Sequence, residues 1–299
     1  MKLRQRERPA PDRSVESDTW GLAPGEQIRP GLKAMSLLGG GRLFEAYLAH
    51  DGRRMCLVVA KLLRPGRLDR SSVECLRREF EALKRLDHPV IARGFDACFD
   101  GSQPHLTLEH LEGPRLSTLL RRYGPLPMDQ LLPLALQLGS ALHYMHEVGM
   151  LHLDVKPKNI IMSGPPRLID LSIARTLEGA AGLDGPTGTT GYMAPEQEDP
   201  RGPVKVGTGA DSWGLGVTLF EAATGRLPIP SERPRLGRTG RGPELPAQFQ
   251  EVVSRCLAAD PAERPRPGEA VLALEPLVAA LPRRFPLSPP RPGSYGGRG

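Results

Sequence analysis

The sequence predicts an α+β protein of two unequal lobes, a small strand-rich lobe followed by a larger, mainly helical one. Two observations support this prediction. Between Leu32 and Leu108 the apolar residues mostly alternate or run together over strand-like lengths, whereas after Gly113 they recur at helical spacing. The chain has 299 residues, of which 39% are hydrophobic, so it is long enough to form both lobes.

The first lobe is predicted to contain a hairpin and a helix. LFEAYLAH (43–50) and CLVVAKLL (56–63) have strand patterns, and the turn-forming pair Asp51-Gly52 stands between them. Residues 71–86 have apolar side chains at helical spacing, with serines available as the N-cap. Strand character returns in HLTLEHL (105–111).

Helical periodicity in the second lobe is clearest between Leu131 and Met145, and Gly149 follows as a helix-ending residue. A further helix is predicted from Ser212 to Thr224, ending at Gly225. Another is predicted from Pro246 to Ala258.

Both ends of the sequence are predicted to lie outside the folded domain. Residues 1–29 are polar, charged and proline-bearing, which favours a flexible basic arm. Residues 282–299 are expected to form a disordered Pro/Gly/Arg-rich tail, with binding to a proline-recognising domain as the less favoured alternative. The domain itself is predicted over 30–281, with the first lobe over about 30–110 and the second over about 112–281.

Composition argues against several classes of function. The net charge is +6, but the basic residues are scattered and many lie near the two ends, so no nucleic-acid binding is expected. No run approaches the roughly 20 apolar residues of a membrane span, and the N-terminus lacks the apolar segment of a secretory signal. The four cysteines lack metal-site spacing and fit reduced thiols. We therefore expect a cytoplasmic protein without a membrane span.

The segment HLDVKPKN (152–159) places an acid, a cation and an amide on one short loop. Phosphoryl transfer needs a carboxylate that receives the proton of the attacking hydroxyl and a cation that offsets charge on the moving group. It also needs an oxygen ligand for magnesium. Asp154, Lys156 and Asn159 are therefore the candidate catalytic residues.

This loop resembles the HRDxKxxN loop of the eukaryotic-type (Hanks-type) serine/threonine protein kinases, and further motifs follow in that family's order over residues 31–280. The resemblance, closest to bacterial members, implies a two-lobed kinase fold. It implies transfer of the γ-phosphate of ATP to Ser or Thr hydroxyls of proteins, with Mg²⁺ or Mn²⁺ as the metal. Its substrates are expected to include the chain itself, which implies self-phosphorylation or a dimer acting in trans.

The resemblance also implies roles in the nucleotide site. Lys61 in VVAK corresponds to the lysine that grips the α- and β-phosphates, and Glu79 to its helical partner. Asp170 in LIDLS and Asn159 correspond to the metal ligands. The remaining cofactor-binding residues are predicted in the glycine-rich loop, the adjoining strands, the hinge and the floor of the site: Leu38, Gly39, Gly41, Ala46, Ala60, Glu109, Leu111 and Ile161.

Motifs further along the chain favour a protein substrate, since aminoglycoside and choline kinases share the lobe plan and a similar loop. GYMAPEQ (191–197) resembles the end of an activation segment, and DSWGLG (211–216) resembles the helix that anchors the catalytic loop. Arg264 resembles the late arginine that pairs with Glu196. Thr189 matches the serine/threonine pattern and is expected to hydrogen-bond within the catalytic loop.

Three motifs depart from the family pattern. Phe44 stands where the third glycine of the phosphate-covering loop is usual, Leu153 replaces the arginine of HRD, and Leu171-Ser172 replaces the Phe-Gly of DFG. Because that arginine receives the charge of a phosphorylated activation segment in many relatives, phosphate on Thr187 or Thr190 is not expected to be a strict requirement. The alternative to an active enzyme is a pseudokinase scaffold that binds nucleotide and partners without efficient phosphotransfer.

Overall fold

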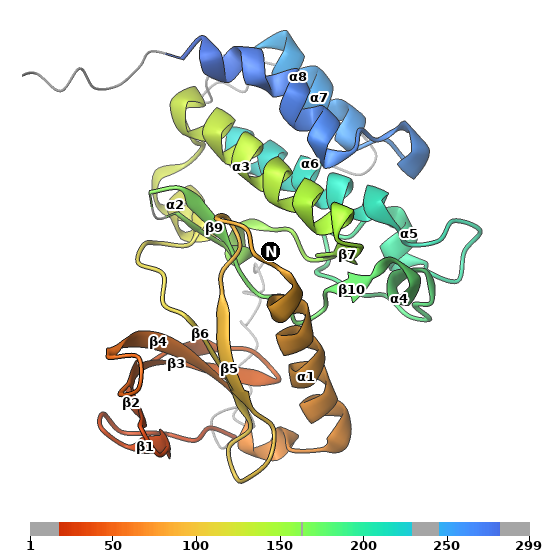
Figure 1. Ribbon diagram of the computed structural model, residues 1–299. Coiled ribbons are helices and arrows are strands. Elements are labelled where there is room, and N and C mark those ends of the chain that lie inside the picture. The colour runs from red at the N-terminus through yellow and green to blue at the C-terminus, as the bar shows by residue number, and fades with distance from the viewer. Residues whose placement is uncertain (1–17, 163, 229–244, 282–299) are drawn as a thin grey trace, which may run out of the picture.

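The computed structural model describes residues 18–162, 164–228 and 245–281, which form two lobes (Figure 1). The first lobe, drawn in the lower half of Figure 1, contains a sheet and one long helix, and the second is mainly helical. This arrangement confirms the predicted α+β class and the two-lobed plan. Residues 1–17 of the predicted arm and the predicted tail at 282–299 lie outside the described residues.

The first lobe is built on a six-stranded sheet in the order β1-β2-β3-β4-β6-β5, in which every neighbouring pair is antiparallel. The predicted hairpin is β3 and β4, and its last pair is Asp51 opposite Cys56. The strands span Gln27–Arg29 (β1), Leu32–Gly40 (β2), Phe44–Asp51 (β3), Cys56–Leu63 (β4), Gly94–Cys98 (β5) and His105–Glu109 (β6).

The two faces of this sheet belong to different hydrophobic clusters, because successive residues of a strand point to opposite faces. Ala60 on β4 and Tyr47 on β3 lie in a small cluster on one face. Leu106 on β6, which pairs directly with Lys61, lies in the main core on the other face. Lys61 therefore projects toward the main core and the second lobe.

Residues 18–29 correct the predicted N-terminal boundary. Strand β1 forms the edge of the sheet, and the indole N–H of Trp20 donates to the carbonyl oxygen of Leu63 at 2.6 Å. Trp20 and Leu22 also pack against the small cluster that contains Ile28. The prediction of a flexible arm is therefore wrong for this stretch, because its three large apolar residues reach the same cluster.

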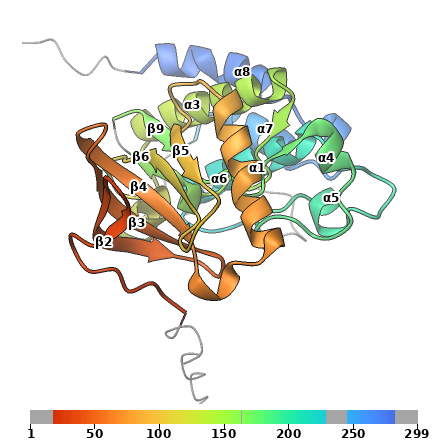
Figure 2. The same ribbon diagram turned by 60° about the horizontal axis from the view of Figure 1, so that its bottom comes forward.

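Helix α1 (Arg70–Arg85) lies beside β5 in both views (Figures 1 and 2) and confirms the predicted helix to within one residue at each end. Its cap is the carboxylate of Asp69, which accepts from the backbone N–H of Ser72 at 3.0 Å, rather than a serine. A short 3₁₀ turn, η1 (Pro65–Arg67), joins β4 to this helix.

The second lobe confirms the three predicted helices as α3, α6 and α7. Helix α6 ends before Gly225, whose φ of 74° is the left-handed cap that glycine adopts readily. Gly139 allows α3 and α8 to pack closely, since a Cβ there would lie 2.6 Å from Cγ2 of Val271. The helices span Leu116–Tyr123 (α2), Met128–Glu147 (α3), Leu177–Ala181 (α4), Pro195–Glu198 (α5), Thr208–Thr224 (α6), Ala247–Cys256 (α7) and Pro267–Ala279 (α8).

Two small sheets complete this lobe, and their strands β7 and β8 directly precede and follow the segment 152–159. β7 pairs with β10, and β8 pairs with β9. Among the described residues, no helix combines the length and apolar character needed to cross a bilayer. The remaining elements are Met150–Leu151 (β7), Pro157–Asn159 (η2), Ile160–Met162 (β8), Pro166–Leu168 (β9), Arg175–Thr176 (β10) and Pro261–Glu263 (η3).

Candidate active site

The ammonium group of Lys61 joins the two lobes. Its Nζ lies 2.8 Å from both carboxylate oxygens of Glu79 on α1 and 2.8 Å from Oδ1 of Asp170 in the second lobe. Asp170 has a φ of 68°, a left-handed conformation that is uncommon outside glycine and concentrates at functional sites. The structure thus brings together the three charged residues that the sequence motifs suggested.

Burial disfavours each of these charges, and their mutual attraction decides which persist. Burial lowers the pKa of Lys61, but the carboxylates of Asp170 and Glu79 outweigh it and leave this pKa above its ordinary value. Burial likewise raises the pKa of Asp170, but the Lys61 ammonium outweighs it and the pKa falls well below the ordinary range. For Glu79, burial prevails over Lys61, so its pKa is raised.

Phe44 covers one side of the same ammonium. The centroid of its ring lies 4.5 Å from Nζ of Lys61, which is cation–π distance. The aromatic residue in place of the third glycine therefore does more than change the backbone of the loop. It occupies space beside the lysine.

Asp154, Lys156 and Thr189 form a second polar cluster. Lys156 Nζ lies 2.5 Å from Oδ2 of Asp154 and also contacts Oγ1 of Thr189. The Thr189 hydroxyl donates to Oδ1 of Asp154 at 2.7 Å, which confirms the hydrogen bond expected for this threonine. The side-chain amide of Asn159 donates to Oδ2 of Asp154 at 2.9 Å. The three candidate catalytic residues therefore touch one another.

Asn159 and Asp170, the predicted metal ligands, lie on neighbouring backbone segments, since the N–H of Ile169 donates to the carbonyl of Asn159 at 2.9 Å. The amide nitrogen of Asn159 is turned toward Asp154, which leaves its amide oxygen for a cation. Asp170 uses Oδ1 for Lys61 and for the N–H of Ser172, which leaves Oδ2. This pair of oxygen donors fits Mg²⁺, which prefers oxygen ligands and retains several waters.

Asp211 on α6 holds the catalytic loop from beneath. Its carboxylate accepts from the backbone N–H groups of His152 at 2.9 Å and Leu153 at 2.7 Å, and Nε2 of His146 lies 2.9 Å away. Burial alone would raise the pKa of Asp211, but these hydrogen bonds and the histidines lower it. They also hold Leu153 at a φ of 64°. The anchoring role expected for this helix is confirmed.

Leu153 itself is buried in an apolar cluster with Ala180 and Ala194, which belong to the segment after Asp170. The side chain of Gln197 adds hydrogen bonds to the carbonyls of Leu153 at 2.9 Å and Thr187 at 2.8 Å. Apolar packing and an uncharged amide therefore connect the activation segment to the catalytic loop. The motif GYMAPEQ contains this glutamine, but its spacing gave no sign of the contact.

The predicted pair between Arg264 and Glu196 is confirmed. The guanidinium binds both carboxylate oxygens, at 2.6 and 3.0 Å, and the two side chains are at most 2% exposed. Arg264 also donates to three backbone carbonyls and lies 5.0 Å from the ring of Trp213. Every side of this arginine is therefore occupied by protein.

Four of the predicted nucleotide-binding residues, Leu38, Gly39, Gly41 and Ala46, belong to the β2–β3 hairpin. Ala46 is directly opposite Lys61 and shares its face, and Gly39 pairs with Ala46. Leu38 is 49% exposed, so its apolar side chain is accessible to a ligand. Gly41 begins the tip of the loop, where its N–H donates to the carbonyl of Phe44 at 2.9 Å.

Ala60 was wrongly predicted to contact the nucleotide. It is fully buried in the small cluster on the far face of the sheet, because neighbours along a strand point in opposite directions. Val59, two residues before Lys61 and opposite Leu108, lies on the face of the lysine. The two-residue period of a strand was a sequence signal that could have identified Val59.

The hinge uses the side chain of Glu109 for structure. Its carboxylate lies 2.5 Å from Nη2 of Arg167 and accepts from the backbone N–H of Arg93 at 3.1 Å. The backbone N–H of Glu109 donates to the carbonyl of Arg93 at 2.9 Å, so only its backbone carbonyl is a candidate for contact with a ligand, together with the backbone of Leu111. Ile161 lies on β8, two residues after Asn159.

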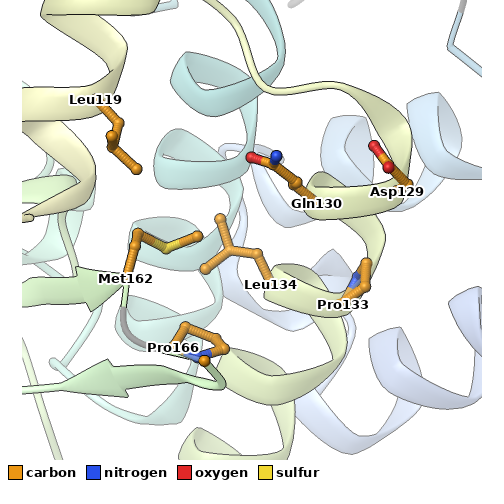
Figure 3. A pocket seen from close by; sticks show the side chains of 8 residues that line it. Leu119, Asp129, Gln130, Pro133, Leu134, Met162 and Pro166 are labelled. Carbon is orange, nitrogen blue, oxygen red and sulfur yellow. The ribbon is translucent and has the colours of Figure 1, made fainter. Parts of the chain in front are cut away.

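A pocket of about 370 Å³ lies elsewhere, between α2, α3 and the β8–β9 hairpin (Figure 3). None of the predicted site residues lines it, so it is separate from the two polar clusters. Its lining residues are Leu119, Asp129, Gln130, Pro133, Leu134, Met162, Gly164 and Pro166.

The geometry defines a class of protein. One polar cluster suits the phosphates of a nucleotide and the other suits an attacking hydroxyl, as in phosphotransferases with the protein kinase fold. The protein kinase domain family matches residues 32–273, more than half of the chain, so the chain belongs to this family.

Three bacterial proteins are among the relatives of this chain. The probable serine/threonine-protein kinase PkwA of Thermomonospora curvata is 32% identical over 263 residues, covering 85% of this chain and 35% of the relative. PknK of Mycobacterium tuberculosis is 32% identical, covering 81% and 23%. PrkC of Bacillus subtilis is 28% identical, covering 80% and 39%. The chain thus spans between 23% and 39% of the length of these relatives.

Proposed function

We propose that this chain is a protein serine/threonine kinase that transfers the γ-phosphate of ATP to Ser and Thr hydroxyls of proteins. One observation carries the proposal: the Lys61 cluster and the Asp154 cluster are both complete, with the expected contacts in each. The names of the bacterial relatives, which are serine/threonine kinases, support the same activity.

The nucleotide is held by the first lobe and the hinge. Lys61 positions the α- and β-phosphates, and Glu79 keeps the lysine in place through two hydrogen bonds. The backbone of Gly39 and Gly41 covers the phosphates. The adenine lies between apolar side chains and meets the backbone of the hinge; these residues are Leu38, Ala46, Val59, Ile161, Glu109 and Leu111.

Asp170 and Asn159 would hold Mg²⁺, or Mn²⁺ as a substitute, which would offset the charge of the phosphates when bound. Asp154 orients the incoming hydroxyl and receives its proton. Its two oxygens already accept from Thr189, Lys156 and Asn159, and an ionised carboxylate has roughly four acceptor positions, so a further donor fits. Lys156 screens the charge on the transferred group.

The protein substrates are proposed to include this chain, phosphorylated within one molecule or by a second copy in trans. A nucleic-acid partner is not part of the proposal, and the cytoplasmic location stays a prediction from composition. The pseudokinase alternative has no specific observation in its favour, because every charged group that the reaction needs is present.

The proposal is tested by incubating purified protein with γ-labelled ATP and Mg²⁺, with and without a chelator, and mapping the labelled residues by mass spectrometry. Metal-dependent label on serine or threonine is the expected result. ATP binding without any label on the chain or on a generic protein substrate would establish the pseudokinase instead.

A further inference from the structure

Arg64, directly after β4, joins three parts of the first lobe. Its Nε donates to the carbonyl of Gly41 at 2.7 Å, and its backbone N–H donates to the carbonyl of Leu43 at 3.0 Å. Its Nη1 donates to Oε1 of Glu45 at 2.9 Å and to the carbonyl of Asp18 at 2.6 Å. One side chain thus contacts the tip of the glycine-rich loop, a strand and the N-terminal segment.

Glu45 is a buried charge that these contacts satisfy. Its side chain is only 1% exposed, and a buried carboxylate costs several kcal/mol unless it is paired and hydrogen-bonded. Its second oxygen accepts from the backbone N–H of Trp20 at 3.2 Å and from the hydroxyl of Tyr47 at 3.1 Å. The N-terminal segment therefore completes the shell around the Arg64–Glu45 pair.

The same segment is attached at two further points along the chain that follows Lys61. The indole of Trp20 donates to the carbonyl of Leu63 at 2.6 Å, and Oδ1 of Asp18 accepts from the N–H of Gly66 at 2.5 Å. Gly66 allows this approach, since a Cβ there would lie 2.9 Å from the carboxylate. Residues 18–20 thus lie across the end of β4.

The contacts of Arg64 fix the direction of the loop backbone. In a trans peptide unit the C=O and the N–H point in opposite directions. Because Arg64 holds the carbonyls of Gly41 and Leu43, the N–H groups of Arg42 and Phe44 point away from it. Phosphate-binding loops use backbone N–H groups of this kind.

We infer that residues 18–20 and the Arg64–Glu45 pair form a clamp that positions the glycine-rich loop for ATP, which makes Trp20, Glu45 and Arg64 positioning residues. The inference rests on the proposed function for the identity of the ligand. Residues that precede the part of the chain matched by the kinase family (32–273) thereby act on nucleotide binding.

Two variants test the clamp. Arg64→Met with Glu45→Gln removes both charges together, so that neither is left buried alone. Trp20→Phe keeps an aromatic ring but removes the indole donor and part of the ring volume, and it serves if the double variant does not fold. Arg29→Ala is the matched control. Arg29 lies on β1, which follows the clamp residues along the chain, and its ion pair with Asp96, at 3.0 Å, does not touch the loop.

The measurements are the Kd for ATP by titration without protein substrate, the separate kcat and KM values for ATP, and amide exchange over residues 39–44. In the double variant we expect Kd and KM for ATP to rise about tenfold, with kcat changed less and faster exchange in the loop. Trp20→Phe is expected to shift the same quantities in the same direction by a smaller factor, and Arg29→Ala to leave them unchanged.

Folded variants that bind ATP as tightly as the wild type, with unchanged exchange in the loop, would show that the contacts serve stability alone and would overturn the inference. An equal shift in Arg29→Ala would overturn it too, because the effect would then be general to the segment. Wild-type protein that binds no nucleotide would contradict the proposed function as well, so the two failures are distinguishable.

Discussion

Two buried ion pairs, Lys61 with Glu79 and Arg264 with Glu196, have different surroundings. Arg264 is enclosed by a carboxylate, three backbone carbonyls and an indole ring, and its side chain has no exposed surface. Lys61 is 12% exposed, and its third partner, Asp170, is 36% exposed. Only the Lys61 pair has a side on which a ligand can replace a protein partner.

The comparison separates an ion pair that holds the fold from one that performs chemistry. A fully enclosed pair contributes through the cost of leaving either charge alone. A pair with an accessible partner also presents its cation to an anion such as a phosphate. Variants at the two sites should therefore affect different measurements.

The largest effect on activity is expected for Lys61→Met. We expect kcat/KM to fall by about 10²- to 10³-fold, the usual cost of losing one electrostatic contact to the reacting group. The unfolding free energy should change less than in Arg264→Met, because Glu79, whose pKa burial already raises, takes up a proton. Lys84→Met is the control, since Lys84 lies exposed on α1, the helix that carries Glu79. Near wild-type kcat/KM in Lys61→Met would contradict the assignment.

Arg264→Met is expected to give the largest loss of stability. Removing one partner of a buried pair costs about 3 to 5 kcal/mol, measured here by urea unfolding, while the folded fraction keeps most of its kcat. Adding Glu196→Leu should recover part of the stability by removing the unpaired charge. A loss below about 1 kcal/mol would place this pair in the class of surface ion pairs.

Asp211 is predicted to make stability depend on acidic pH. A carboxylate whose folded pKa is lowered stabilises the protein above its unfolded pKa of about 3.9, and this stabilisation is lost as pH falls through the folded value. The unfolding free energy should therefore decline below about pH 4. Asp211→Asn should make this decline shallower, and an unchanged slope in denaturant titrations at several pH values would argue against it.

The smallest effect is expected for Thr187→Ala with Thr190→Ala. Leu153 holds the activation segment through apolar packing, and Gln197 adds uncharged hydrogen bonds, so phosphate has no arginine of HRD to bind. The phosphotransfer rate should stay within about two- to threefold of the wild type, the scale of an ordinary surface substitution. A fall by orders of magnitude would show that loop phosphate is required.

Local motifs predicted the charged residues of the site because kinase chemistry constrains residue type and spacing within each short segment. Lys61, Glu79 and Asp170 come from three such segments, and the fold brings them together. Their order along the chain also predicted the two-lobed fold. Ala60 was an error of strand phase, which the alternation around Lys61 could have prevented.

The contacts that could not be predicted are long-range and lack a sequence motif. Trp20 meets Leu63 across 43 positions, and Arg64 meets Asp18 across 46. The composition of residues 18–29 indicated a flexible segment because a single tryptophan adds little to an average, although one partly buried ring with a hydrogen-bonded indole holds this stretch. The ring of Phe44 over Lys61 depends likewise on side-chain direction, which composition does not specify.

The most direct test of the account is Asp154→Asn. This change keeps the size of the side chain and removes the group that receives the proton of the hydroxyl. We predict that incorporation of γ-phosphate into protein falls by about 10²- to 10⁴-fold, while the Kd for ATP and the unfolding free energy stay close to wild type. Undiminished phosphate incorporation in this variant would contradict the assignment of Asp154 and with it the proposed reaction at this site.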